Sequence, residues 1–141
     1  GAKRGRALKN TFLANMPDLK NLQKKVVDKA DTLGYINGLD GRRLFIRYSH
    51  AALNTLLQGA GAIVCKKRAV LIDMYTRKDK LDAHLVCSVH DQYVYEVHTD
   101  DVEQFKLVCY KSISEAGKIL KVRCPLTCEV GVGKTWFDAN H

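Results

Sequence analysis

The sequence predicts an α+β fold in which helices pack against an antiparallel sheet. One long stretch, residues 49–76, repeats apolar side chains at the period of a helix. Two pairs of short apolar and aromatic runs are each joined by a turn signal, at Asp40-Gly41 and at His90-Asp91, so each pair is expected to form a hairpin. Hairpins among helices favour an antiparallel sheet with helices on it.

The first part of the chain, residues 1–48, is expected to form two helices and a hairpin. Residues 3–14 have a helical pattern without a cap or an initiator Met, so we expect the chain to begin partway through a larger protein. Pro17 suits the first turn of a second helix, and Gly34 suits its end. Residues 35–46 then provide the first hairpin.

The second part, residues 49–141, is expected to begin with the long helix. Ser49 has the side chain of an N-cap, and the apolar pattern runs to about Thr76. Gly59 and Gly61 inside this helix cost stability, which indicates that another backbone or a ligand approaches closely there.

The second hairpin is predicted over residues 85–97. Asp100 and Glu103 have the spacing of a capping box, which would start a helix that ends near Leu120. The β-rich run 122–130 is predicted as a last strand, and the remainder as a tail. The whole chain is expected to be one partial domain.

The composition is that of a soluble globular protein. Hydrophobic residues make up 46% and charged residues 27% of the chain, which argues against disorder. The longest apolar runs, such as residues 69–72, are far below the roughly 20 residues that span a bilayer, and no signal segment opens the chain. Five cysteines without a C-x-x-C pair indicate reduced thiols. We therefore expect a cytoplasmic protein with no membrane partner.

The net charge of +8 is unevenly distributed. Residues 1–80 hold 17 Lys and Arg against 6 Asp and Glu, a balance of +11. Residues 81–141 hold 6 against 9, a balance of −3. This division suggests a surface for an anionic polymer beside a site that gathers carboxylates. The alternative is an ordinary solvated face of Lys-rich helices.

A carboxylate at the tip of the second hairpin is the main candidate for chemistry. Asp91 would protrude from two paired strands, so its charge need not be buried. Such a carboxylate can hold Mg²⁺, which binds one or two carboxylates together with phosphate oxygens and water. The alternative, which the residues alone favour, is a turn Asp that only accepts hydrogen bonds from nearby backbone amides.

A phosphate-binding loop near the end of the chain is rejected. Residues 131–135 (GVGKT) match the end of a P-loop, but the pattern requires a glycine where Cys128 stands. It also requires a following helix whose first turn faces the phosphates, and too few residues remain after Thr135. An ATPase is therefore not expected.

Several stretches resemble one family of enzymes, the family A (bacterial polymerase I-like) DNA polymerases. Residues 89–97 (VHDQYVYEV) are similar to motif C of that family, which reads His-Asp-Glu before an apolar strand. Residues 38–44 (GLDGRRL) and 50–58 (HAALNTLLQ) resemble its Gly-Arg-Arg hairpin and the helix that follows. The sequence of residues 50–58 is most similar to the replicative polymerases of short-tailed bacteriophages. The ending from Glu129 to His141 resembles the family's C-terminus.

The resemblance implies a C-terminal part of the polymerase palm, in an enzyme that adds deoxynucleotides to a primer 3′ end under the direction of a template. Asp91 would be one of two aspartates that bind a pair of Mg²⁺ ions, which stabilise the attacking 3′-oxygen and the leaving pyrophosphate. His90 would lie against the primer terminus. Asn54 and Gln58, four residues apart on a helix, would reach the DNA minor groove. The alternative for these two amides is ordinary solvated polarity.

The same resemblance places Arg42, Arg43 and His50 on the DNA-binding surface. His50 stands where bacterial members have Arg, in agreement with the bacteriophage branch. The implied partners are primer-template DNA, deoxynucleoside triphosphates and the upstream remainder of the polymerase.

One position departs from the family pattern. Gln92 stands where the family usually has Glu, so one negative charge near the metals is absent. On charge alone, we expect Gln92→Glu to keep or raise activity. The alternative function, which Gln92 favours and the His90-Asp91 pair opposes, is a non-catalytic DNA-binding module or subunit derived from a polymerase.

The chain alone is expected to lack polymerase activity. The resemblance implies that the first palm aspartate, and the helix whose Arg and Lys grip the triphosphate, lie upstream of Gly1. A sheet edge and an apolar helix face would then be uncovered, so we expect the isolated chain to self-associate.

Overall fold

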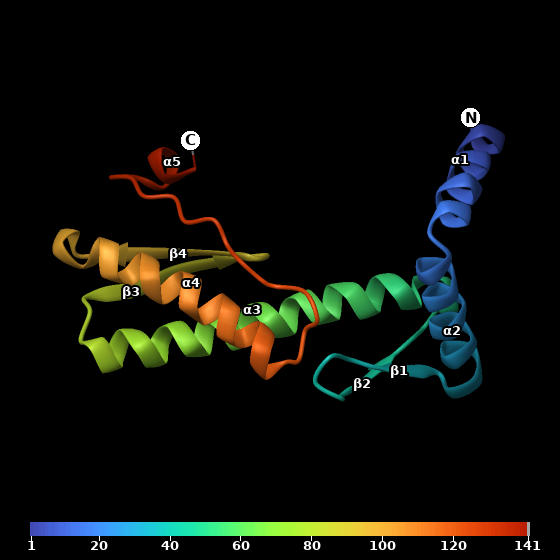
Figure 1. Ribbon diagram of the computed structural model, residues 1–141, viewed down its shortest axis with the longest axis horizontal. Helices are drawn as coiled ribbons and strands as arrows, with labels where there is room; N and C mark the ends of the chain where they lie inside the picture. Colours follow the sequence, from blue (N-terminus) through green and yellow to red (C-terminus); the bar gives the residue numbers. More distant parts are fainter. Residues whose placement is uncertain (141) are drawn as a thin grey trace. The chain divides into compact units, whose positions relative to one another are not determined.

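The computed structural model describes residues 1–140 and confirms the α+β class (Figure 1). The strands form two separate two-stranded antiparallel sheets. The chain divides into two compact units, the first ending at Gly59 and the second beginning at Ala60. The division falls inside the long helix α3 (Ala52–Asp79). No helix among the described residues is long and apolar enough to cross a membrane.

The first unit begins with helices α1 (Ala2–Asn15) and α2 (Pro17–Leu33). Pro17 occupies the first turn of α2 as expected, because its missing N–H is one that a helix start leaves unbonded. Gly34 ends α2 with a left-handed φ of 71° and donates its N–H to the Ala30 carbonyl. Glycine suits this position because it has no side chain to clash in that conformation.

The first hairpin pairs β1 (Tyr35–Asn37) with β2 (Arg43–Phe45), as predicted. Gly41, in the connecting turn, has a φ of 83°, which explains the Asp-Gly sequence there. The hairpin places apolar side chains against α2 and the start of α3. This small core consists of buried Val26, Ala30, Ile36 and Ala52, with Leu44, Ile46 and Leu56 packed against it.

The predicted cap of the long helix is wrong. A 3₁₀ turn, η1 (Ser49–Ala51), precedes α3, and the Ser49 side chain makes no capping hydrogen bond. The Ala51 N–H instead bonds to the Tyr48 carbonyl, so a backbone turn starts the helix. The helix ends at Asp79, slightly later than expected.

The two glycines of α3 differ in their surroundings. A Cβ added to Gly59 would lie 3.3 Å from Leu44 Cδ1, so a close neighbour is present there. Within residues 1–140, no atom outside the helix lies within 4 Å of a Cβ at Gly61. The close neighbour at Gly59 is thus a side chain, and the predicted approach of a backbone or a ligand is not observed at either position among the described residues.

The second unit contains the second predicted hairpin, formed by β3 (Ala83–Val89) and β4 (Gln92–Val97). Val89 pairs with Gln92, so His90 and Asp91 form a tight turn between the strands. The register shifts between Leu85 and Cys87, which marks a bulge in β3.

A second 3₁₀ turn, η2 (Thr99–Asp101), leads into helix α4 (Val102–Ile119). The predicted capping box does not form. Asp101 holds the N-cap position without a side-chain capping bond, and its Oδ2 accepts a hydrogen bond from the Asp82 N–H at 2.8 Å. The carboxylate thus ties the helix start to the residue before β3, which a local sequence pattern cannot anticipate.

The core of the second unit lies where α3, α4 and the β3–β4 hairpin meet (Figure 1). Apolar positions at helical spacing supply most of it, as the periodicity of α3 predicts. The buried members are Leu71, Ile72, Tyr75, Phe105, Val108, Cys109 and Ala116. The side chains packed against them include Leu81, Ala83, Tyr95, Val97, Cys128 and Val130.

The predicted last strand is wrong, because residues 122–130 form no ladder with either sheet. Pro125 lacks the N–H that a ladder requires. The alternating pattern instead reflects partial burial of every second side chain, including Leu126, Cys128 and Val130. Figure 1 shows this segment returning past the hairpin.

The predicted tail contains a short helix, α5 (Trp136–Ala139). Thr135 and Asp138 form a reciprocal capping box at its start. One helical turn therefore does follow the rejected P-loop sequence. His141, included in the C-terminal resemblance, lies outside the described residues.

Candidate active site

The tip of the β3–β4 hairpin carries the residues predicted to take part in chemistry. His90, Asp91 and Gln92 are all exposed there. His90 has a φ of 54°, a left-handed conformation that is uncommon for a residue other than glycine. Such a conformation costs about 1–3 kcal/mol and persists because paired strands on both sides impose it. The hairpin is thus less stable than it would be with a glycine at this position, but its tip residues are held in one arrangement.

The Asp91 carboxylate is free of hydrogen bonds and ion pairs within residues 1–140. The turn-Asp alternative, in which the side chain accepts bonds from nearby amides, is therefore not what the structure contains. The charge does act through space on Cys65 of α3. Partial burial, assisted by the Asp91 charge, raises the pKa of the Cys65 thiol above its ordinary value. Asp91 is thus an exposed acceptor beside the long helix.

Asp91 fits a metal site that other groups complete. No cluster of three or more His, Cys, Asp or Glu side chains suited to a metal ion occurs among the described residues. Mg²⁺ commonly takes one or two carboxylates and fills its remaining positions with water and phosphate oxygens. A single free carboxylate at a rigid tip suits that role and does not suit a closed structural metal site.

The Gln92 side chain is hydrogen-bonded to the C-terminal turn. Its Nε2 donates a hydrogen bond to Asn140 Oδ1 at 2.7 Å. Asn140 was not predicted as part of the site, because a hydrogen bond across 48 positions leaves no local signal. The capping pattern of Thr135 and Asp138 is the feature that could have revealed an ordered turn there.

The strand behind the tip, β4, packs inward through Tyr93 and Tyr95. The Arg68 guanidinium lies 5.7 Å from the centre of the Tyr93 ring. The Tyr95 ring meets that of Phe105 at 4.8 Å in a tilted arrangement. Burial raises the pKa of Tyr95 to about 12, in agreement with its packing in the core. These contacts hold β4 against α3 and α4.

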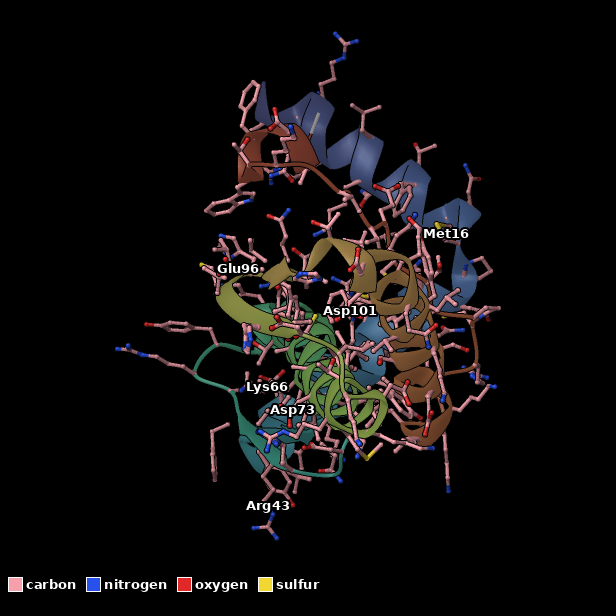
Figure 2. All side chains as sticks on the ribbon, turned by 90° about the vertical axis from the view of Figure 1, so that its left-hand side faces the viewer. Met16, Arg43, Lys66, Asp73, Glu96 and Asp101 are labelled. Atoms are coloured by element: carbon pink, nitrogen blue, oxygen red, sulfur yellow. The ribbon has the colours of Figure 1, made fainter. Side chains whose placement is uncertain are left out.

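The predicted DNA-binding residues all belong to the first unit, and their surroundings differ. Asn54 and Gln58 are exposed on α3. The Arg43 guanidinium lies 4.8 Å from the centre of the Tyr35 ring (Arg43 is labelled in Figure 2). His50 stacks on Tyr48 with ring centres 5.7 Å apart.

Arg42 differs because its guanidinium is paired. Its Nε and its terminal nitrogen each lie 2.7 Å from Asp40 Oδ2. Desolvation raises the pKa of Asp40, but the backbone and side-chain hydrogen bonds from Arg42 outweigh it and leave the pKa below its ordinary value. Arg42 therefore stabilises the hairpin turn, and its charge is less available to an external anion than that of Arg43. Arg47, which was not among the predicted residues, has its guanidinium 5.3 Å from the Tyr48 ring centre.

The arrangement of elements is that of a polymerase domain. The fold matches, with a TM-score of 0.90, the solved POL domain of Pol1 from M. smegmatis in complex with DNA primer-template and dNTP. The match covers 100% of this chain and 26% of that one, at 22% sequence identity, so it establishes the fold alone.

The sequence of residues 1–138 matches the protein-family model described as DNA polymerase family A. The chain is 34% identical over 147 residues to the DNA-directed DNA polymerase of Escherichia phage Phieco32, covering 99% of this chain and 24% of that protein. It is 30% identical over 152 residues to DNA polymerase I of Pseudomonas aeruginosa, covering 98% of this chain and 16% of that protein. The chain belongs to DNA polymerase family A, which confirms the resemblance seen in its motifs. It spans about a quarter or less of the length of these relatives.

Proposed function

We propose that this chain is the C-terminal part of the palm of a DNA-directed DNA polymerase, a single partial domain that contributes one catalytic carboxylate. The observation that carries the proposal is the Asp91 carboxylate, exposed at the hairpin tip and free of protein partners within the described residues. In the complete enzyme, the reaction is template-directed transfer of deoxynucleotides to a primer 3′ end.

Asp91 is proposed to hold Mg²⁺ in the complete enzyme. Bound there as a pair, Mg²⁺ would neutralise charge on the attacking oxygen and on the leaving pyrophosphate. The contribution of this chain is to keep the carboxylate fixed, since the two paired strands of the hairpin leave its backbone little freedom. His90, beside Asp91, is proposed to contact the primer terminus.

The first unit is proposed to contact primer-template DNA. Asn54 and Gln58 are exposed side chains four positions apart on α3 and thus share a face. Amide groups suit the minor groove, where base pairs in either orientation offer similar acceptors. Arg43 and His50 add positive or aromatic surface for the backbone, whereas Arg42 contributes less because Asp40 neutralises it.

The remaining partners are proposed to be deoxynucleoside triphosphates and the upstream part of the polymerase. A groove of about 430 Å³ in the second unit exposes Val70 and Leu85, which are 62% and 51% accessible. We propose that the rest of the palm covers this groove in the complete enzyme and that isolated chains associate through it. The setting is proposed to be the cytoplasm of a bacterial or phage-infected cell.

A second candidate is a non-catalytic DNA-binding subunit derived from a polymerase. The observation that favours it is the neutral Gln92 side chain, which is already bonded to Asn140 instead of adding charge beside Asp91. Such a subunit would bind DNA with the same first unit and would not need Asp91.

One experiment separates the two candidates. In a polymerase that contains this chain, Asp91→Asn should abolish primer extension and leave DNA binding largely intact, because it removes a ligand charge and little else. The matched control is Glu96→Gln, the same loss of charge at an exposed position on β4. Normal extension by the Asp91→Asn enzyme would exclude the catalytic role and favour the binding subunit.

A further inference from the structure

We infer that Asn140 is a positioning residue, which docks the C-terminal turn onto the candidate catalytic hairpin by accepting a hydrogen bond from the Gln92 side-chain amide. The inference deepens the proposed function and rests on it for the catalytic role of the hairpin. It assigns a structural use to the Gln that replaces the family's usual Glu.

The direction of the Gln92–Asn140 hydrogen bond is determined by a second bond. Asn140 Nδ2 donates to the Trp136 carbonyl at 3.0 Å. The Oδ1 atom is therefore the part of the Asn140 amide that points toward Gln92, and the group that meets it at 2.7 Å must be a donor. Gln92 supplies this donor through Nε2, and a glutamate carboxylate at the same position has no proton to give.

The turn that holds Asn140 is built to stay in place. The Thr135 N–H and hydroxyl both donate to Asp138 Oδ2, at 3.1 and 2.7 Å, and the Asp138 N–H donates back to the Thr135 hydroxyl at 3.2 Å. The preceding chain crosses directly over the turn. A Cβ at Gly133 would lie 2.6 Å from the Ala139 nitrogen, and one at Gly131 would overlap the Ala139 carbonyl oxygen. Glycine is therefore required at both positions for this close approach.

The consequence concerns the residue next to Asp91. The hydrogen bond to Asn140 restricts the rotation of the Gln92 side chain. The C-terminal turn therefore stabilises the position of the hairpin tip. A Glu at position 92 would set a carboxylate against the Asn140 carbonyl oxygen, since an acceptor would then face an acceptor. This reverses the expectation from charge alone, under which Gln92→Glu keeps or raises activity.

Trp136 provides a direct readout of the docked turn, since it is the single tryptophan of the chain and lies in α5. Trp136 is 49% accessible in the docked turn, so release of the turn should raise the acrylamide quenching constant, by at most about two-fold. We expect this rise in Gln92→Glu and in Asn140→Ala, with circular dichroism confirming that both remain folded. The double variant should be no worse than either single one, because both changes remove the same bond.

Two further variants calibrate the experiment. Gly133→Ala should release the turn by steric overlap and thereby supply the undocked reference value. Glu96→Gln, which exchanges a carboxylate and an amide elsewhere on β4, should leave the quenching constant unchanged (Glu96 is labelled in Figure 2). Quenching equal to the parent protein in both Gln92→Glu and Asn140→Ala, or effects of the two that add, would overturn the inference.

A second readout tests the link to catalysis. In a polymerase containing this chain, Gln92→Glu and Asn140→Ala should each lower kcat about ten-fold at unchanged KM for primer-template, because a misplaced site slows chemistry without losing binding surface. Unchanged kcat in both would overturn the positioning role. The Asp91→Asn variant should keep the parent quenching constant, so a failure of the proposed catalytic role and a failure of the docking contact give different results.

Discussion

Leu126 packs directly over the backbone of Gly117, with its Cδ1 and Cγ atoms 3.2 Å from the place where a Cβ of residue 117 would lie. Gly117 is buried in α4, and Leu126 belongs to the extended segment that follows it. The absence of a side chain on the helix therefore allows the segment after α4 to lie close, although no strand ladder holds it.

Glycine-to-alanine substitution should distinguish this position from an open one. Gly61→Ala should raise the free energy of unfolding by about 1 kcal/mol, because alanine is the better helix former and no protein atom obstructs the new methyl group. Gly117→Ala should gain less than Gly61→Ala or lose stability, because Leu126 must move. Chemical denaturation of both variants measures the difference, and an equal gain would contradict the packing.

The end of α4 offers a test of backbone strain. Lys121 has a φ of 53°, and the N–H of the next residue, Val122, bonds to the Gly117 carbonyl at 2.9 Å. This closing arrangement normally uses glycine. Lys121→Gly should therefore raise the free energy of unfolding by about 0.5–1 kcal/mol. As a control, Lys118→Gly in the last turn of α4 should lower it by about 1 kcal/mol, since that residue is helical.

The strained His90 should separate stability from function. His90→Gly removes the cost of a φ of 54°, so the free energy of unfolding should rise by about 1 kcal/mol. The same change removes the imidazole, so primer extension by a polymerase containing the chain should fall. His90→Ala should lose activity without the gain in stability. A fully active His90→Gly enzyme would show that the ring has no role at the primer terminus.

Two neighbouring arginines should contribute unequally to DNA binding. Arg43 has a free guanidinium charge over Tyr35, whereas Arg42 is paired with Asp40. Arg43→Ala should reduce the slope of log affinity against log salt by about 0.9, the value for one phosphate contact on duplex DNA. Arg42→Ala should reduce it less, and Asp40→Asn should strengthen binding by releasing Arg42. Titrations at several salt concentrations measure these slopes, and equal slopes for the two arginine variants would contradict the difference.

Local signals predicted the elements that local interactions build. Pro17 and Gly34 bound α2 because their backbone preferences act within one turn of helix. The two hairpins follow from turn sequences that join alternating strands. Ser49 and the Asp100–Glu103 pair were misjudged because a 3₁₀ turn, in each case, occupies the position where the cap was expected.

The family, the α+β class and the position of Asp91 at a hairpin tip could all be predicted from the chain's residues in order, because motif order and turn chemistry are properties of consecutive residues. Contacts between distant segments, and no local pattern, establish that residues 122–130 dock without pairing and that Gln92 bonds to Asn140. Each of these depends on which donor, acceptor or apolar surface is close in space. Folding brings together groups that are many positions apart in the sequence, and no local sequence pattern relates such positions.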